Sequence, residues 1–152
     1  MLLAPKLMAR QRGVTMLELL IVVVIVAIIT AFAYPSYMQY VVSTKRTAAT
    51  VTLMQIAERQ QQFFMDNKSY TNDLTNLGYA ANPLSINDSG NSVAAGDGDS
   101  VYTITLSNIT ATTYTATAAP LQGQLSRDTD CGSLTLNQAG ARGNSAGGEG
   151  CW

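Results

Sequence analysis

Glu18 is the residue whose chemistry needs explaining first, because it lies at the entrance of a long apolar run. No other charged residue occurs between Leu19 and Thr44. An acid within a membrane segment costs roughly 2.5–3.5 kcal/mol on insertion scales, so it tends to have a partner. Thr15 and Glu18 also have the spacing of a capping box, which would start a helix. Two roles are therefore open, a helix cap and a charge that pairs with a cation.

Cys131 and Cys151 form the second group with chemical potential. Their spacing fits neither a redox CxxC pair nor a zinc site with four ligands. In an exported protein such a pair forms a disulfide, whereas in the cytosol it would be two free thiols. A bond closing a loop of roughly 20 residues would stabilise the tail by about 3 kcal/mol.

Other patterns that could do chemistry are few. The chain has no histidine, which removes the commonest general base and the commonest metal ligand. Asp97-Gly98-Asp99 has the alternate acids of a calcium loop, but the rest of an EF-hand pattern is missing and a turn explains it equally well. We find no nucleophile–base pairing and no phosphate loop. We therefore expect no enzyme activity, no cofactor and no metal site.

Charge is sparse and unevenly distributed. Charged residues make up 12% of the 152 residues, about half the usual share of a soluble domain, and apolar residues make up 47%. Three of the nine basic residues precede Gly13, so six basic and ten acidic residues follow it. A nucleic-acid binder normally carries a basic excess. A local basic patch remains open, from Lys68, Arg127 and Arg142.

The apolar run itself is long enough to cross a bilayer. Its first part, Leu19–Ile29, is unbroken, and a span needs about 20 residues. The basic residues upstream place the N-terminus in the cytoplasm and the body outside. A cleaved signal peptide is the rival interpretation, because Ala31-Phe32-Ala33 offers a cleavage site. Its apolar region would typically have about 7–15 residues, and Glu18 would have no role there.

Helical periodicity continues beyond Pro35 and ends only near Asn67-Lys68-Ser69. If Pro35 kinks the helix without ending it, residues 14–65 form one helix about 78 Å long. The apolar residues near one helical face are Val42, Ala49, Leu53, Ile56, Phe63 and Phe64, with Lys45, Arg46, Glu58 and Arg59 on other sides. A domain of this size cannot bury such a helix, so its first half must lie in lipid or against other subunits.

The segment Gly13-Val14-Thr15-Met16-Leu17-Glu18, between a basic leader and an apolar helix, resembles the prepilin peptidase site of type IV pilins. The resemblance implies cleavage after Gly13 and N-methylation of Val14, where the family usually has Phe. It also implies a helix kink at Pro35. The amine created at Val14 has a reference pKa of about 8 and stays largely protonated. Glu18 could then pair with that amine in its own chain or, as the family suggests, in a neighbouring subunit.

Later segments resemble the PilE-type minor pilins. These are Tyr34–Tyr37, Gln61–Phe64, Ser69–Thr71, Asp130–Gln138 and the terminal Cys151-Trp152. The resemblance implies an α+β fold, in which a long N-terminal helix packs against a small antiparallel sheet. The expected parts are a removed leader (1–13), a transmembrane and assembly helix (14–35), its amphipathic half (36–66), a connecting region (67–100) and a sheet closed by the disulfide (101–152).

Within the body, three runs alternate as strands do: Val101–Leu106, Thr113–Ala118 and Ser133–Asn137. The first two should form an antiparallel hairpin. A short helix should end near Leu77-Gly78. Residues 82–100 have the composition of a loop, and 143–150 that of a flexible segment. The three strands would need the helix for stability.

The function expected from these features is structural. The chain would be a minor subunit of a type IV pilus, inserted in the inner membrane with its body in the periplasm and then assembled into an extracellular filament. The expected partners are other pilin subunits, the prepilin peptidase and the inner-membrane assembly machinery. The alternatives are a pilin that binds DNA or a surface, and a type II secretion pseudopilin.

Overall fold

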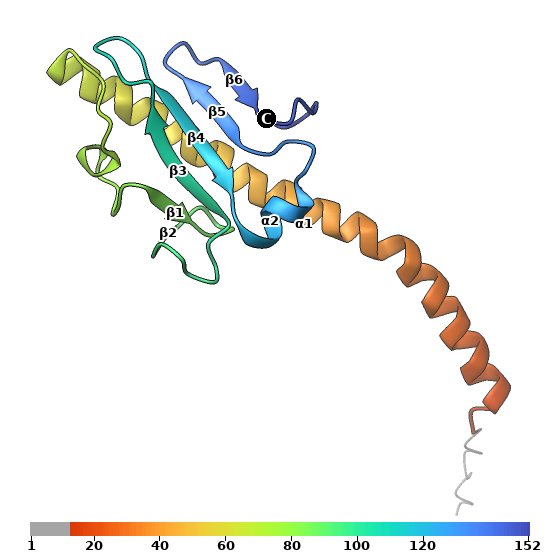
Figure 1. Ribbon diagram of the computed structural model, residues 1–152. Helices are drawn as coiled ribbons and strands as arrows, with labels where there is room; N and C mark the ends of the chain where they lie inside the picture. The colour runs from red at the N-terminus through yellow and green to blue at the C-terminus, as the bar shows by residue number, and fades with distance from the viewer. Residues whose placement is uncertain (1–12) are drawn as a thin grey trace, which may run out of the picture. The chain divides into compact units, whose positions relative to one another are not determined.

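The computed structural model of the protein describes residues 13–152, and the basic leader up to Arg12 lies outside the described residues. The chain divides into two compact units, residues 1–38 and 39–152, each described here by itself (Figure 1). Helix α1, Met16–Asn67, has 52 residues and contributes to both units. Its bounds agree with the helix expected from the periodicity of the sequence.

The described part of the first unit consists mainly of the N-terminal part of α1, and its side chains are exposed apart from Met38, which is half-buried. Large apolar residues here are about half to nine-tenths exposed, for example Met16 at 87% and Phe32 at 76%. This part is long and apolar enough to cross a membrane, and none of its apolar window is buried. Pro35 lies inside α1, with helix on both sides of it. An apolar helix left uncovered needs lipid or another chain to remove it from water.

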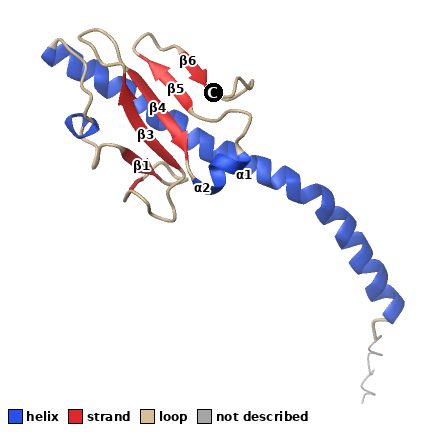
Figure 2. Cartoon of the chain, viewed as in Figure 1, coloured by secondary structure: helices blue, strands red, loops and turns tan. Residues whose placement is uncertain are grey.

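The second unit packs the C-terminal half of α1 against a six-stranded antiparallel sheet (Figure 2). The strand order is β2-β1-β3-β4-β5-β6. The strands are β1 Leu84–Ile86, β2 Ser92–Val93, β3 Tyr102–Ser107, β4 Thr115–Pro120, β5 Leu134–Asn137 and β6 Arg142–Asn144. Two short helices complete the unit: η1, Leu74–Leu77, and α2, Gln122–Arg127. The expected α+β class is confirmed.

One face of the sheet forms the core with α1. Along β3 and β4 the residues alternate between buried and more exposed, as expected where one face of an antiparallel sheet is covered. Buried Ile104 lies opposite Ala118, which lies opposite Leu134. From α1, Ala49, Leu53 and Ile56 are fully buried in the same cluster. The apolar face predicted for the second half of the helix is therefore the one that packs.

Paired side chains fix the turn that leads out of α1. The Gln60 amide donates to the Thr71 carbonyl at 2.8 Å, and its oxygen accepts from the Thr71 N–H at 3.1 Å. Gln60 is fully buried, so both of its hydrogen-bonding groups need these partners. The Tyr70 ring stacks on Phe64 and meets Tyr114 edge-on, each at 4.8 Å between ring centroids. These contacts join the end of the helix to the start of β4.

The sheet is larger than the sequence indicated. The expected β3–β4 hairpin is confirmed, and so is a short helix ending at Gly78, whose φ of 81° suits glycine. The interpretation of residues 82–100 as a loop was wrong, because β1 and β2 lie within it. The segment 143–150 is not simply flexible, since its start forms β6 beside β5. Strands of two or three residues are too short to show an alternating pattern.

Tyr114 generates a prediction on stability. Its hydroxyl is buried with no hydrogen-bond partner among the described residues, and burial raises the pKa of Tyr114 to about 12. A raised pKa stabilises the fold fully below the ordinary pKa of 10.0, and this stabilisation is lost as pH rises through the folded value.

We expect Tyr114→Phe to leave the free energy of unfolding at pH 7 unchanged or raise it by up to about 1 kcal/mol, because an unpaired buried hydroxyl is costly. The loss of stability above pH 10 should also become shallower. Urea unfolding at neutral and alkaline pH measures both effects. Tyr40→Phe, at a 72% exposed position, is the control and should change neither. A clear loss of stability at pH 7 would show that the hydroxyl has a partner.

Candidate assembly site

The start of α1 shows how Glu18 is presented. The Glu18 N–H donates to the hydroxyl of Thr15 at 3.2 Å, so Thr15 caps the helix. The reciprocal bond of a full capping box, from the Thr15 N–H to the Glu18 carboxylate, is not among the hydrogen bonds of the described residues. Gly13 precedes this cap, and a side chain there would meet nothing within 4 Å. Backbone capping is therefore accomplished by Thr15, and the Glu18 carboxylate is left for another partner.

Gly13, Val14 and Glu18 are all exposed, so the structure places them on an accessible helix start. Within the part of the chain that is described, the salt bridge between Arg46 and Asp128 is the only one, so Glu18 has no ion-pair partner among these residues. The acid lies next to apolar residues such as Leu17 at 69% and Leu19 at 54% exposure. This arrangement is suited to contact with another chain or a lipid surface and offers no group for catalysis beyond the single carboxylate.

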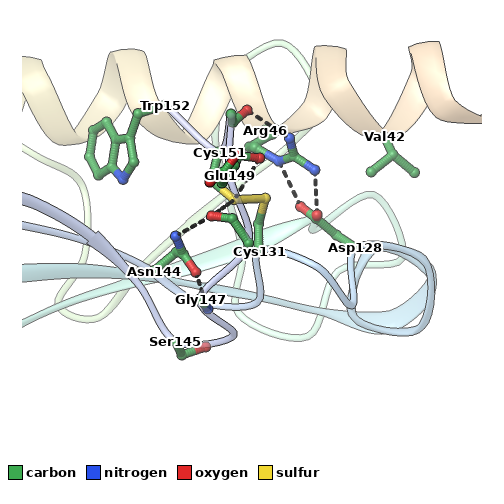
Figure 3. Close-up of a disulfide and its surroundings, with 12 residues drawn as sticks. Val42, Arg46, Asp128, Cys131, Asn144, Ser145, Gly147, Glu149, Cys151 and Trp152 are labelled. Carbon is green, nitrogen blue, oxygen red and sulfur yellow. Dashed lines mark hydrogen bonds and ion pairs between the residues drawn. A yellow bond between two sulfur atoms is a disulfide. The ribbon is translucent and has the colours of Figure 1, made fainter.

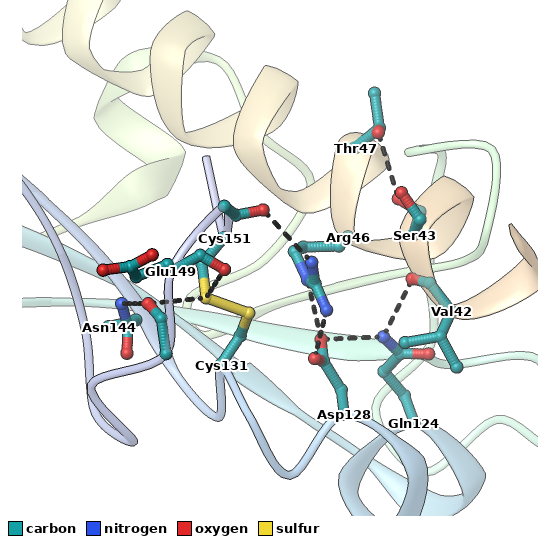
Figure 4. A network of polar contacts seen from close by, with 12 residues as sticks. Val42, Ser43, Arg46, Thr47, Gln124, Asp128, Cys131, Asn144, Glu149 and Cys151 are labelled. Atoms are coloured by element: carbon teal, nitrogen blue, oxygen red, sulfur yellow. Dashed lines mark hydrogen bonds and ion pairs between the residues drawn. A yellow bond between two sulfur atoms is a disulfide. The ribbon is translucent and has the colours of Figure 1, made fainter. Parts of the chain in front are cut away.

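The body contains a second polar site, centred on the buried Asp128 (Figure 4). Its carboxylate accepts two hydrogen bonds from the Arg46 guanidinium, one of them from Nε at 3.1 Å. It also accepts from the Tyr102 hydroxyl at 3.1 Å and from the Gln124 amide at 3.1 Å. The same amide lies 3.2 Å from the Val42 carbonyl of α1. The acid thus connects α1, β3 and α2.

Electrostatics in this site follow from burial and pairing. The Asp128 side chain is completely buried, and that of Arg46 is 18% exposed. The hydrogen bond with Asp128 raises the pKa of Arg46 above its ordinary value. Burial raises the pKa of Tyr102, so its hydroxyl remains a proton donor to Asp128. Removing one partner from such a network destabilises the fold, because the remaining buried charge has lost its hydration and no other group replaces it.

The disulfide lies beside this network (Figure 3). Cys131 and Cys151 are joined at a sequence separation of 20, so the expected bond is present. It holds the tail where the Gly150 carbonyl accepts from Arg46 Nη1 at 3.5 Å. Gly148 donates to the Asp130 carbonyl, and a Cβ on Gly148 would collide with that oxygen. Glycine is therefore required for the tail to cross next to Cys131.

Trp152 completes the attachment of the tail. Its indole N–H donates to the Gly143 carbonyl at 2.9 Å, and the Arg142 guanidinium lies over its ring at 5.4 Å. Gly143 and Arg142 both belong to β6. The terminal residue is consequently held against the edge of the sheet.

The sequence placed Arg46 on a side of the helix other than the apolar face, and this was wrong, because Arg46 is mostly buried and pairs with Asp128. Asp128 and Gln124 were not anticipated at all. A signal was present in the spacing. Arg46 follows Val42 by four residues and precedes Ala49 by three, which places all three on one helical face. A cation on a face that packs requires an acid nearby, and Asp128 lies only three residues before Cys131.

The three residues of the proposed basic patch do not form one surface. Lys68 follows the C-terminal end of α1, where its ammonium donates to the Met65 carbonyl. Arg127 belongs to α2, which contacts α1 at Val42 through Gln124. The helix rises about 35 Å from Val42 to Met65. Arg142 is held over Trp152 on the β5–β6 hairpin.

Asp97-Gly98-Asp99 lies in the turn between β2 and β3. The Asp97 carboxylate accepts from the Asp99 N–H at 2.9 Å, as in a local turn of the backbone. Among the described residues there is no group of three or more side chains suited to hold a metal ion. The turn interpretation of this motif therefore accounts for the geometry.

Comparison with known proteins adds sequence relationships to this geometry. A family model described as "Type IV minor pilin ComP, DNA uptake sequence receptor" matches residues 35–135, and the prokaryotic N-terminal methylation motif matches residues 8–34. The type IV major pilin protein PilA of Myxococcus xanthus is 33% identical over 90 residues, covering 59% of this chain and 40% of that protein.

Two further proteins to which the chain is similar are also named as pilins. The type IV wide pilus major component PilA4 of Thermus thermophilus is 32% identical over 82 residues, covering 52% of this chain and 63% of that protein. The aligned part therefore spans less than two thirds of either curated relative. A solved type IV pilin from Shewanella oneidensis has a TM-score of 0.48 and 17% identity, covering 73% of this chain and 97% of that one.

A methylation motif that leads into a long exposed helix, followed by a body with an antiparallel sheet, defines a type IV pilin. Within this class, the chain belongs to the family of the type IV minor pilin ComP, whose model spans residues 35–135. The resemblance to type IV pilins noted in the leader and helix is thereby confirmed.

The Arg46–Asp128 pair generates a prediction on the body. We expect Arg46→Ala to lower the free energy of unfolding by about 3 kcal/mol, because it leaves Asp128 buried without its cation. The exposed Arg127→Ala is the matched control and should change it by less than about 0.5 kcal/mol. Urea unfolding of the full chain in detergent, followed by fluorescence of Trp152, measures both. Equal stabilities of the two variants would contradict a stabilising role for the pair.

Proposed function

We propose that this chain is a structural subunit of a type IV pilus that assembles through the N-terminal part of α1. The observation that carries the proposal is an exposed apolar helix with one acid, Glu18, whose carboxylate has no partner among the described residues. The methylation motif at residues 8–34 supports it. Membership of a family of structural proteins also argues against an enzyme.

Processing would create the missing partner. Cleavage after Gly13 exposes the α-amine of Val14, and N-methylation leaves that amine basic. Residues 14–35 would then act as the transmembrane and assembly helix, kinked at Pro35, with 36–66 as the half that carries the body. In a filament, the amine of one subunit can neutralise Glu18 of its neighbour. Because a lone acid in an apolar environment is costly, the pairing favours one register between subunits.

The location follows from the same features. Before assembly, the helix would hold the chain in the inner membrane with the body in the periplasm, an oxidising compartment suited to the Cys131–Cys151 bond. The prepilin peptidase, the inner-membrane assembly machinery and other pilin subunits are the proposed partners. We assign a minor role within the filament, supported by the minor-pilin family model, although both curated relatives are named as major pilins.

Glu18→Ala tests this function. We expect normal cleavage at Gly13 and normal membrane insertion, but at least about a tenfold loss of the subunit from sheared filaments, because the acid no longer pairs with a neighbouring amine. N-terminal sequencing measures processing, and immunoblotting of sheared and membrane fractions measures assembly. Glu149→Ala, an exposed acid of the body, is the control and should assemble normally.

Two outcomes would decide against the proposal. A mature N-terminus at Tyr34 would show a cleaved signal peptide and no pilin processing. Normal filament entry of the Glu18→Ala protein would reduce Glu18 to part of a helix start that Thr15 already caps.

A second candidate function is capture of DNA, and the description of the matched family as a DNA uptake sequence receptor favours it. Exposed cations are few, and the α1 positions next to Lys68 and to the helix of Arg127, Met65 and Val42, are about 35 Å apart along the helix axis. Any contact would therefore use a small number of phosphates, and affinity would fall only modestly with salt.

This candidate is tested by measuring binding of duplex DNA to the full chain across a salt series. If DNA is a ligand, the logarithm of the binding constant should fall with the logarithm of the salt concentration with a slope of about −1 to −3. Arg142→Ala or Arg127→Ala should each make this slope shallower by about 1, because one phosphate contact is lost. Gln138→Ala, an uncharged change on the same hairpin as Arg142, should leave the slope unaltered. The absence of salt-sensitive binding would remove DNA from the list of ligands.

A further inference from the structure

Leu125 of helix α2 is an apolar side chain that the fold leaves at the surface. It is 58% exposed, while Gln124 and Asp128 beside it are buried. Arg127, also exposed, is the only charged residue within α2. In the second unit the other exposed large apolar side chains all lie on α1, and they are Tyr40, Val51, Met54 and Met65. The exposed side of α2 therefore combines one apolar group with one cation, and neither is part of the network around Asp128.

A groove of about 540 Å³, called here the α1 groove, lies in the second unit between α1 and the turn that joins β1 to β2. One wall is formed by α1 from Tyr40 to Gln55, and the other by residues 88–90. Three threonines of the α1 wall bond to carbonyls of their own helix through their hydroxyls, and they are Thr44, Thr47 and Thr52. With these hydroxyls engaged, the threonines offer an occupant their methyl groups, beside the 45% exposed side chain of Val51. The α1 groove is therefore suited to an apolar side chain.

The rim of the α1 groove is acidic. Asp88 is exposed there, and its carboxylate accepts a hydrogen bond from the hydroxyl of Ser89 at 3.2 Å. A neighbouring depression is lined by Asp88, Asp99 and Lys45, so two acids there face one cation. Within the described chain neither Asp88 nor Arg127 belongs to a salt bridge. The cation on α2 and the acid at the α1 groove are thus opposite in sign, and each is available to a partner outside its own chain.

α2 and the α1 groove lie on opposite sides of the second half of α1. Val42, which α2 contacts through Gln124, is on the packed face of the helix (Figure 4), whereas Thr44 lines the groove. Positions two residues apart on an α-helix are turned by about 200°, so these two directions differ by about 160°. Leu125 therefore does not reach the groove of its own chain. A protrusion and a recess on opposite sides of a molecule join copies head to tail, and such a contact repeats in an open row.

We propose that α2 of one copy docks in the α1 groove of a second copy of this chain, with Leu125 against Val51 and Arg127 beside Asp88. Docking of this kind rests on the proposed function, because the membrane and the filament bring copies of the chain together. A helix of six residues covers less than the roughly 1,000 Å² of a stable interface, so the contact alone is weak between dilute bodies. It becomes effective where the N-terminal helices hold the copies at a high local concentration.

Disulfide trapping of the full processed chain, in vesicles of phosphatidylethanolamine and phosphatidylglycerol, tests this docking. One chain carries both Leu125→Cys and Val51→Cys, and because the native cysteines are already joined to each other, an added oxidant couples only the new thiols. We expect a ladder of dimers, trimers and longer products on non-reducing gels, since each copy has one protrusion and one groove. Leu125→Cys with Met65→Cys is the matched control, because Met65 is 63% exposed but about 21 Å from Val51 along the helix. This control pair should give no ladder.

Exchange of the two charges, in the chain that carries Leu125→Cys and Val51→Cys, tests the ion pair. Arg127→Glu or Asp88→Arg alone should lower the yield of the ladder at least about fivefold, because like charges then face each other. The two changes together should restore at least about half of the yield, since the pair is remade with its signs reversed. Both positions are exposed, and circular dichroism with the thermal midpoint verifies that each variant is folded.

Three results would overturn the docking: no ladder from the pair at Leu125 and Val51, an equal ladder from the control pair at Met65, or a double charge exchange that restores nothing. Filament entry of the wild-type chain, measured separately, reports on the pilus function. A chain that enters filaments but gives no ladder keeps the pilus function and loses the docking. A ladder in vesicles from a chain that never enters filaments supports the docking and removes the pilus function.

Discussion

The body of this pilin depends on α1, whose first part is exposed and whose second part is packed against the sheet. From Gln39 onward α1 supplies the surface on which the sheet folds, and Ala49, Leu53 and Ile56 are fully buried there. The buried Asp128 secures this packing, because its four donors come from α1, β3 and α2. A carboxylate in such a position tolerates little displacement of any donor. The orientation of the sheet on the helix is therefore constrained by charge as well as by apolar contact.

The disulfide and the ion pair act on the same region by different means. The covalent bond limits how far the tail can depart from Cys131 in the unfolded chain, and the ion pair stabilises the folded arrangement directly. Arg46 connects the two, since it contacts both Asp128 and the Gly150 carbonyl. In an oxidising compartment the tail is thus held at its end by Cys151 and Trp152, while its glycines cross close to the backbone of Asp130.

Much of this structure could be predicted from the sequence, and the failures have physical causes. Long apolar periodicity located α1, and six-residue alternation located β3 and β4. Strands β1, β2 and β6 were missed because two or three residues cannot display a period, so their pairing is set by neighbours. Asp128 was missed because its partner Arg46 is 82 residues away: the helical face of Arg46 indicates that an acid is needed, but local pattern does not say which acid supplies it. The cap at Thr15 was foreseen because it is local.

The two edge strands of the sheet are short, and this limits how copies of the protein can associate at high concentration. β2 has two residues and β6 has three, so neither edge offers a long row of unpaired N–H and C=O groups. Extended edges are where sheets of separate molecules join and aggregate. A protein concentrated in a membrane plane or a filament meets its own copies constantly. With both edges this short, strand pairing between copies has little backbone to extend from, so the sheet itself is a poor starting point for open-ended association.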